Sequence, residues 1–361
     1  MSDFVLFMCA ALLGWLLVHL TVPPLDRMCR RFGLLDRPSP RKIHHDPTPR
    51  LTGISLFAAL WGTALLLSLV MPERLQEMRG HSGAILIGAG LILLLGILDD
   101  LHPLVALWKL TGQVLVGIFL WQQGIGFTQL WVPFVGGIEL GYLSLPVTLL
   151  WFLVLVNAVN IIDGLDGLAT ATAGTALLPL IWISVSLELT PIWVASAALL
   201  GALVAFWRYN RAPARVFMGD CGSLTLGYFF AVVALLAPIK RFTALAFFIP
   251  LIAIMLPLAE SVFSLGRRSL ARTNPIGADT GHLHHRLMAA GWTANQVVVA
   301  YAVVTAVFGV FCVAFRYGNR RIVAALLGFF VLLLMAALGI ILRRAIPTRT
   351  EGKKVREGSG G

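Results

Sequence analysis

Long apolar runs recur along the whole sequence of 361 residues, and they constrain its fold more than any other feature. A helix needs about 20 mostly apolar residues to cross the hydrocarbon core of a bilayer, and only helices and closed barrels satisfy their backbone hydrogen bonds there. The runs have helical length and lack the alternation of barrel strands. With 58% hydrophobic and 12% charged residues, the sequence predicts an all-α polytopic membrane protein.

We expect about eleven transmembrane helices. The first run has the length of a signal peptide, but Ser2-Asp3 provides no basic start and residues 21–24 are a poor cleavage site, so it should remain as an anchor. We expect one membrane domain over residues 1–345 and a disordered cytoplasmic tail over 346–361. The predicted spans are 4–25, 51–71, 82–98, 106–121, 143–161, 170–187, 192–207, 221–238, 243–265, 296–315 and 321–342.

Basic residues set the expected orientation, because Lys and Arg are retained on the cytoplasmic side of short loops. An outside N-terminus and a cytoplasmic C-terminus place 21 of the 28 lysines and arginines on the cytoplasmic side. The net charge of +11 then reflects topology and attraction to anionic lipid and substrate, and it does not indicate nucleic-acid binding. The four scattered cysteines indicate neither a disulfide framework nor a thiolate metal site.

The residues able to do chemistry lie in gaps between the runs, and this topology puts all of those gaps on one side of the membrane. An acid at a span end demands a partner, water or a function, because a charge near the bilayer is costly. We therefore interpret the clusters as one active site at the membrane surface. They are Asp99-Asp100, the run from Asn157 to Gly167, Gly219-Asp220, and His282, His284 and His285.

Two of the acidic clusters have structural alternatives. Asp99 and Asp100 end the third span and repel each other, so they need a basic group such as Lys109 unless they form a solvated helix terminus. Asp220 opens the eighth span. It could cap that helix, or it could hold Mg²⁺, which prefers one or two carboxylates with substrate phosphate and water.

The amide and acid residues before Gly167 recur at intervals of three, so in a helix or tight helical turns they fall near one face. Such oxygen-bearing side chains suit a hard cation and phosphate, and the alternative is a plain turn between two spans. The histidines follow an arginine-rich stretch without cysteines. This pattern favours diphosphate binding over a surface loop or a transition-metal site, and His44, after Lys42, is interpreted in the same way.

Together, in order and over nearly the whole length, these motifs resemble the polyprenyl-phosphate N-acetylhexosamine-1-phosphate transferases. The His-x-His-His pattern is similar to the WecA-like branch, the undecaprenyl-phosphate GlcNAc-1-phosphate transferases, whereas the peptidoglycan branch usually shows Pro-His-His-His. The motifs are Asp36-x-Pro-x-x-Arg41-Lys42-x-His44 with Pro47-x-Pro49, Asp99-Asp100, Asn157-x-x-Asn160-x-x-Asp163-Gly164-x-Asp166-Gly167, Phe217-Met218-Gly219-Asp220-x-Gly222-Ser223, and His282-x-His284-His285.

The resemblance implies transfer of a sugar-1-phosphate, foremost GlcNAc-1-phosphate, from a UDP-sugar to undecaprenyl phosphate, which gives undecaprenyl-diphosphate-sugar and UMP. It implies Mg²⁺, with Mn²⁺ as an alternative, and a multi-pass protein of the bacterial inner membrane with a cytoplasmic active site. The product would begin a surface polysaccharide such as O-antigen of lipopolysaccharide. Another UDP-N-acetylhexosamine, UDP-MurNAc-pentapeptide and a homodimer stay open. Two anionic substrates need cations, so positioning and charge stabilisation suit the reaction.

The resemblance also implies roles for individual residues. Asp99 would lie near the polyprenyl phosphate, and since a phosphate with a second pKa of about 6 is mostly ionised at neutral pH, it either takes a proton or positions the nucleophile. The implied catalytic residues are Asp99, Asp100, Asp163, Asp166 and His282; the substrate-binding residues are Lys42, His44, Lys109, Asn157, Asn160, Arg272, His284 and His285; and the metal ligands are Asp220, Asn160 and Asp163.

Some positions depart from the family pattern. Thr52 stands where the first residue of a Gly-Gly pair is frequent, Thr280 replaces an arginine before the histidines, and Glu260 stands where Asp is usual. The competing class is a transporter, but transporter sites lie near the midplane between repeated halves, and here the polar clusters lie at span ends. A CDP-alcohol phosphotransferase shares an Asp-Gly-rich motif, but the Ala-Arg that should follow it is missing.

Overall fold

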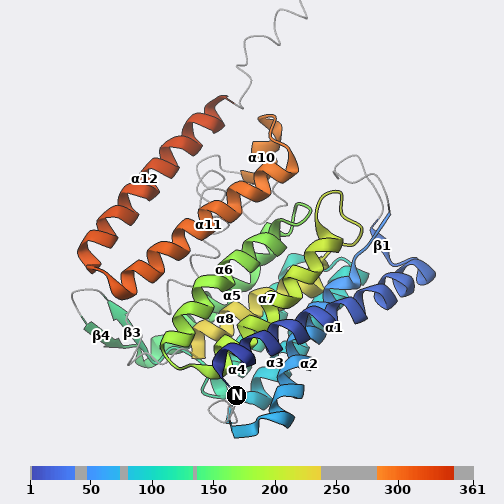
Figure 1. Cartoon of the computed structure of the whole chain (residues 1–361), viewed down its shortest axis with the longest axis horizontal. Coiled ribbons are helices and arrows are strands. Elements are labelled where there is room, and N and C mark those ends of the chain that lie inside the picture. Colours follow the sequence, from blue (N-terminus) through green and yellow to red (C-terminus); the bar gives the residue numbers. More distant parts are fainter. Residues whose placement is uncertain (1, 37–46, 74–79, 133–135, 237–282, 345–361) are drawn as a thin grey trace, which may run out of the picture.

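The computed structural model describes residues 2–36, 47–73, 80–132, 136–236 and 283–344, and this part of the chain is mostly helical (Figure 1). Within it, eight helices are long and apolar enough to cross a membrane: α1, α2 with the short η1 (Leu51–Gly53), α3, α5 with η3 (Gly141–Leu143), α6, α7, α8 and α11. The helices are α1 (Asp3–Phe32), α2 (Ile54–Val70), α3 (Ser82–Leu101), α4 (Ala106–Gln122), α5 (Ser144–Ile162), α6 (Leu168–Ser186), α7 (Thr190–Asn210), α8 (Gly219–Leu236), α10 (Leu283–Ala289), α11 (Ala294–Tyr317) and α12 (Arg320–Arg344).

The helical architecture confirms the predicted fold class of an all-α polytopic membrane protein. The predicted spans 106–121 and 321–342 also form helices, α4 and α12. The predicted span 243–265 lies outside the described residues. Two short antiparallel strand pairs stand between helices: β1 (Leu35–Asp36) with β2 (Thr48–Pro49), and β3 (Gln129–Val132) with β4 (Gly136–Glu139).

The first helix is longer than predicted. The predicted span 4–25 lies within α1, the prolines at 23 and 24 lie inside the helix, and the helix continues to Phe32. A proline lacks the N–H that a helix interior needs, yet one or two such losses can be tolerated when the flanking turns are held by packing. Gly33, with a φ of 69°, ends α1 in the left-handed conformation that glycine adopts without steric cost. The added turns carry Arg27, Arg30 and Arg31 beyond the apolar part of the helix.

Helix α8 is the central helix of the bundle, and α3, α5 and α2 pack around it (Figure 1). Every residue from Cys221 to Leu235 is buried. Tyr228 donates a hydrogen bond of 2.7 Å to the carbonyl of Ile85 in α3, and a Cβ on Gly227 would come within 2.6 Å of Val156 Cα in α5. These contacts place the first turn of α8 between the ends of α3 and α5.

Helices α1 and α7 approach each other closely at two glycines. A Cβ on Gly14 would lie 2.8 Å from the carbonyl carbon of Ala198, and one on Gly201 would lie 2.9 Å from Ala11 Cα. Lipid tails are as apolar as leucine, so helices in a membrane associate through van der Waals packing that small residues permit. The two glycines therefore hold α1 against α7.

Helices α11 and α12 form a hairpin beside the bundle, with α11 packed against α6 (Figure 1). α11 begins with a capping box, in which Thr293 and Gln296 satisfy each other's backbone N–H groups. The short α10 precedes it, and Leu283 and Leu287 of α10 pack against the turn between α5 and α6 through Leu165. This arrangement brings the residues before α11 back to that turn.

We predict that Gly201→Ala lowers the thermal stability of the detergent-solubilised protein, because overpacking of a close interface costs about 1–3 kcal/mol. Gly174→Ala in α6 is the matched control, since a Cβ there meets nothing within 4 Å. Alanine is a better helix former than glycine by about 1 kcal/mol, so the control should unfold at the same temperature or higher. Equal midpoints for both variants would contradict the close α1–α7 contact.

Candidate active site

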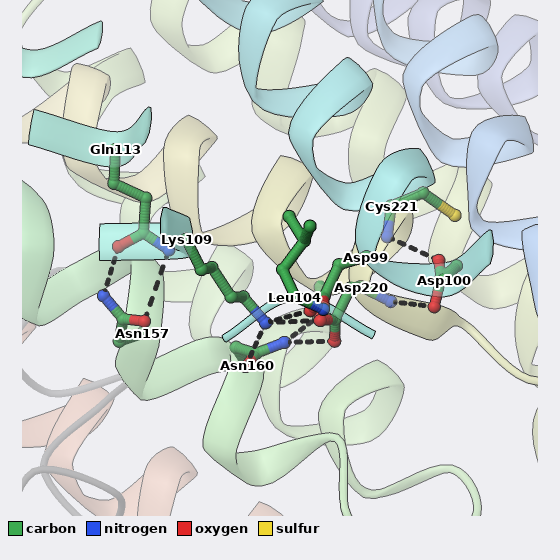
Figure 2. Close-up of polar contacts among 10 residues, drawn as sticks. Asp99, Asp100, Leu104, Lys109, Gln113, Asn157, Asn160, Asp220 and Cys221 are labelled. Atoms are coloured by element: carbon green, nitrogen blue, oxygen red, sulfur yellow. Dashed lines mark hydrogen bonds and ion pairs between the residues drawn. The ribbon is translucent and has the colours of Figure 1, made fainter. Parts of the chain in front are cut away.

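Four helix ends meet around the side chain of Lys109, at the beginning of α4 (Figure 2). Its ammonium group donates to Asp99 Oδ2 at 2.8 Å, to Asn160 Oδ1 at 3.3 Å and to the carboxylate of Asp220. Asp99 lies at the end of α3, Asn160 at the end of α5 and Asp220 at the start of α8. The expected compensation of the acidic pair by Lys109 is thus present for Asp99, and these predicted clusters lie at one end of the bundle.

The adjacent acids Asp99 and Asp100 have different partners. Asp99 accepts from Lys109 and, through Oδ1, from the N–H of Leu104 at 2.6 Å. Its side chain is only 12% exposed, so the alternative of a solvated helix terminus is wrong. Successive residues of a helix point about 100° apart, and Asp100 accordingly contacts the first turn of α8 instead of Lys109.

Asp100 caps helix α8 from outside that helix (Figure 2). Its two carboxylate oxygens accept the backbone N–H groups of Asp220 and Cys221, each at 2.9 Å. The carboxylate also lies against Gly219, whose φ of 66° turns the chain into the helix. The interpretation of Asp220 as the cap of its own helix is therefore wrong, because Asp100 satisfies those groups and Asp220 is left to contact Lys109.

Asn160 connects α5 to α8 through its amide nitrogen. Nδ2 donates to Asp220 Oδ1 at 2.7 Å and to Ser223 Oγ at 2.9 Å, while Oδ1 accepts from Lys109. Ser223 is fully buried and was not among the predicted site residues. Its position three residues after Asp220 places both side chains on one face of α8, so helical spacing was the signal that could have identified it.

The four residues spaced by three do not form one continuous stripe. α5 ends at Ile162, and α6 begins only after Gly167, which has a φ of 75°. Asn157 is paired with Gln113 of α4, and Asp166 accepts the N–H of Ala214 at 2.9 Å in the segment between α7 and α8. The helix ends before the two acids, so Asp163 and Asp166 lie in the turns that follow α5.

Asp163 lies directly after α5, where negative charge is concentrated. Burial raises the pKa of its carboxyl well above the ordinary value, and the carboxylates of Asp220, Asp100 and Asp166 raise it further against the opposing effect of Arg50. Like charges brought together disfavour ionisation, and a cation relieves that repulsion. The turn between α5 and α6 is thus a place where added positive charge would be stabilised.

The segment after β2 packs against the beginning of α8. Thr52 is fully buried and donates a hydrogen bond of 2.6 Å to the carbonyl of Phe217, whose N–H donates to Pro49 at 2.8 Å. A Cβ on Gly53 would lie 2.6 Å from Gly222 Cα. The close approach therefore needs glycine at position 53, whereas position 52 uses its hydroxyl group. This explains how the chain accommodates threonine at the position where the family pattern often has glycine.

The histidine cluster is brought to the turn between α5 and α6. His284 in α10 is buried, and a Cβ on Gly164 would lie 2.7 Å from its Nε2 atom. The rings of His284 and His285 are 4.3 Å apart. The two described histidines therefore lie close to the acidic run, as the interpretation of a single site requires. The predicted residues outside the described part are Lys42, His44, Arg272 and His282.

Comparisons with known proteins agree with this geometry. Residues 82–237, which contain α3, α4, α5 and α8, match glycosyl transferase family 4. A probable undecaprenyl-phosphate N-acetylglucosaminyl 1-phosphate transferase of Bacillus subtilis (strain 168) is 33% identical over 309 residues, which cover 85% of this chain and 84% of the relative. The chain belongs to glycosyl transferase family 4.

Two other relatives of this chain are named for transferring different sugar phosphates. A decaprenyl-phosphate N-acetylglucosaminephosphotransferase of Mycolicibacterium smegmatis is 32% identical over 293 residues, 74% of this chain and 72% of the relative. A phospho-N-acetylmuramoyl-pentapeptide-transferase of Clostridium perfringens (strain 13 / Type A) is 30% identical over 326 residues, 85% of this chain and 95% of the relative. The protein is thus a membrane glycosyl-1-phosphate transferase, and the alternative of a transporter is wrong.

The side chains of this transferase fit a hard divalent cation. Among the described residues, no three acidic, histidine or cysteine side chains group as a metal site by themselves. Mg²⁺ commonly takes one or two carboxylates and completes its shell with water and substrate phosphates. Asp220, Asn160 and Asp163 offer such oxygen donors, and the ammonium of Lys109 between Asp99 and Asp220 shows that the carboxylates already surround a positive charge.

We predict that Asp100→Ala destabilises the protein by about 1–2 kcal/mol, because loss of a helix cap leaves backbone N–H groups unsatisfied. Thermal unfolding in detergent measures this effect. Asp26→Ala is a control, because it also removes a carboxylate, but from an exposed ion pair with Arg30 that contributes little. If both variants unfolded at the wild-type temperature, the capping role would be refuted.

Proposed function

We propose that the protein transfers GlcNAc-1-phosphate from UDP-GlcNAc to undecaprenyl phosphate, which forms undecaprenyl-diphosphate-GlcNAc and releases UMP. The observation that carries this proposal is the contact of Lys109 with Asp99, Asn160 and Asp220 where four helices end. This is a charged and hydrogen-bonding site at the end of an apolar bundle, which suits a reaction between a water-soluble phosphate ester and a lipid-borne phosphate.

The reaction needs little covalent chemistry from the protein. A phosphate oxygen of the lipid attacks the phosphorus that carries the sugar, and the bond from that phosphorus to the oxygen bridging to the uridine-bearing phosphate breaks, so UMP leaves. The attacking phosphate is already mostly ionised at neutral pH. Catalysis then depends on alignment of the two anions and stabilisation of their charge. Lys109 supplies a positive charge for this task, while Asp99 positions it.

The implied Mg²⁺ would be held by Asp220, with oxygen atoms of Asn160 and Asp163 nearby, and Mn²⁺ could replace it. When bound, the ion would neutralise the negative charge of the donor diphosphate. Asp163 supports this assignment, because burial and three neighbouring carboxylates act against its negative charge. His284 and His285 lie beside the same turn, which supports their predicted contact with the diphosphate.

The apolar surroundings of Lys109 support a lipid acceptor. Leu107 and Trp108 precede it in α4, and their side chains are 69% and 68% exposed. Tryptophan is enriched at the interface between membrane and water. A phosphate at Lys109 would therefore have apolar side chains and the bilayer beside it for its prenyl chain.

The distribution of basic residues supports a site on the cytoplasmic face of the inner membrane. The product would then begin a surface polymer such as the O-antigen of lipopolysaccharide or a cell-wall polysaccharide. UDP-MurNAc-pentapeptide is the second candidate donor, because relatives with both kinds of name match most of the chain.

We predict that purified protein with undecaprenyl phosphate and Mg²⁺ releases UMP from UDP-GlcNAc and forms a diphosphate-linked lipid. Parallel reactions contain UDP-GalNAc or UDP-MurNAc-pentapeptide, and mass spectrometry identifies each lipid product. A reaction without the lipid is the control for simple hydrolysis. Turnover only with UDP-MurNAc-pentapeptide would replace the proposed donor. No turnover with any donor, from protein that unfolds cooperatively, would refute the proposed reaction.

We also predict that EDTA stops UMP release and that added Mg²⁺ restores it. Asp220→Asn and Asp99→Asn should each lower kcat by about 100-fold or more, because loss of one preorganised electrostatic contact costs about that much. Asp26→Asn is the matched control, as it makes the same chemical change at a partly exposed site on α1. Normal turnover of either site variant, or full activity in EDTA, would contradict the assignment.

A further inference from the structure

Two amide side chains join α4 to α5 beside the contact between Lys109 and Asn160 (Figure 2). Gln113 Nε2 donates to Asn157 Oδ1 at 3.3 Å, and Asn157 Nδ2 donates to Gln113 Oε1 at 2.6 Å. Each amide thus acts as donor and acceptor for the other. We call this reciprocal pair the amide clasp.

The hydrogen bonds of the clasp fix which way the amide group of Asn157 faces. Asn157 Nδ2 also donates to the backbone carbonyl of Leu153 at 2.8 Å, and since a carbonyl only accepts, the oxygen of Asn157 must face Gln113. Gln113 is fully buried. A buried amide without a partner loses the hydrogen bonds that it would make in water, so separation of the pair is unfavourable.

The clasp belongs to a row of contacts between the two helices. Lys109, Gln113 and Gly117 are each four residues apart on α4, so they lie on one face. Lys109 contacts Asn160, Gln113 contacts Asn157, and a Cβ on Gly117 would meet side chains of α5, including Leu149 Cδ2 at 2.7 Å. α4 therefore meets α5 on three successive turns, and the first of these turns, at Lys109, carries the candidate active site.

We propose that the amide clasp fixes the register of α4 against α5 and thereby positions Lys109 for the reaction. Gln113 and Asn157 are positioning residues in this inference, and Asn157 does not contact a substrate. The inference rests on the proposed function only for its catalytic readout. It adds Gln113, which stands outside the charged cluster, to the residues on which turnover depends.

The position of α4 determines where the ammonium group of Lys109 lies. Lys109 has a flexible side chain, and its three acceptors come from three other helices, so a displacement of α4 changes all three contacts at once. A misplacement of about 1 Å at a reacting centre can cost about 100-fold in rate. A clasp one turn away limits such displacement without contact with either substrate.

The test uses the full-length protein with Gln113→Leu, Asn157→Leu and the corresponding double variant, in the UMP-release assay. We expect each single variant to lower kcat by about 10- to 100-fold through misplacement of Lys109. KM for both substrates should stay within about twofold, as holds when an interaction acts in the transition state alone. Thr111→Val on the exposed side of α4 is the control, since its hydroxyl bonds only within that helix.

The double variant separates a clasp from two independent contacts. Once one amide is lost, the other loses its partner on the facing helix. The double variant should therefore lose no more kcat than the more impaired of the two single variants. Losses that multiply would overturn the inference. The exchange Gln113→Asn with Asn157→Gln keeps the pair and the summed side-chain length, and it should recover at least part of the kcat lost in Gln113→Asn alone. An exchange variant no better than that single variant would count against the clasp.

Two further results separate this inference from the proposed function. If Asn157→Leu raised KM for the donor and Gln113→Leu did not, Asn157 would be a substrate contact and the clasp would be refuted. The thermal unfolding midpoints of the wild type, the two single leucine variants and the double variant test the pair without any substrate. Non-additive changes in these midpoints support the clasp. A wild-type protein without turnover would refute the proposed function, while additive midpoints would refute the clasp.

Discussion

The site depends on one ammonium group held where four helices end. A lysine has three N–H donors, and Lys109 directs them to Asp99, Asn160 and Asp220. Transfer of charges out of water is costly, and it is offset only when the partners have good geometry and complete hydrogen bonding. The ends of α3, α4, α5 and α8 must therefore converge, and the packing of the bundle serves this requirement.

Packing around α8 provides the convergence. The helix lies between α3 and α5, and Gly227 allows the backbones of α8 and α5 to approach. Asp100 then ties the start of α8 to the end of α3, while Asp99 beside it contacts Lys109. The two adjacent acids thus have different roles, because consecutive residues of a helix point in different directions. Asp100 caps α8, and Asp99 belongs to the charged site. Because Asp100 caps α8, the side chain of Asp220 is left to contact Lys109.

The sequence predicted the helical class, most of the spans and the residues of the acidic clusters. It failed where a local pattern was extended past its physical limit. The interval of three before Gly167 continues past the end of α5 at Ile162, so the two acids lie in the turn that follows the helix. Gln113 was not predicted, because a single amide in an apolar run does not by itself indicate a site. Its spacing of four residues from Lys109 places the two side chains on one face of a helix, and this was the signal that could have identified it.

What the sequence determined by itself was the membrane class and the identity of the polar residues, because apolar length and the cost of charge near a bilayer act on each segment separately. Only the tertiary structure decided which polar groups became partners. Asp100 with the start of α8, Gln113 with Asn157, and His284 with Gly164 are contacts between different helices or turns. Such contacts depend on the register and direction of packed helices, and no local pattern in the sequence encodes these.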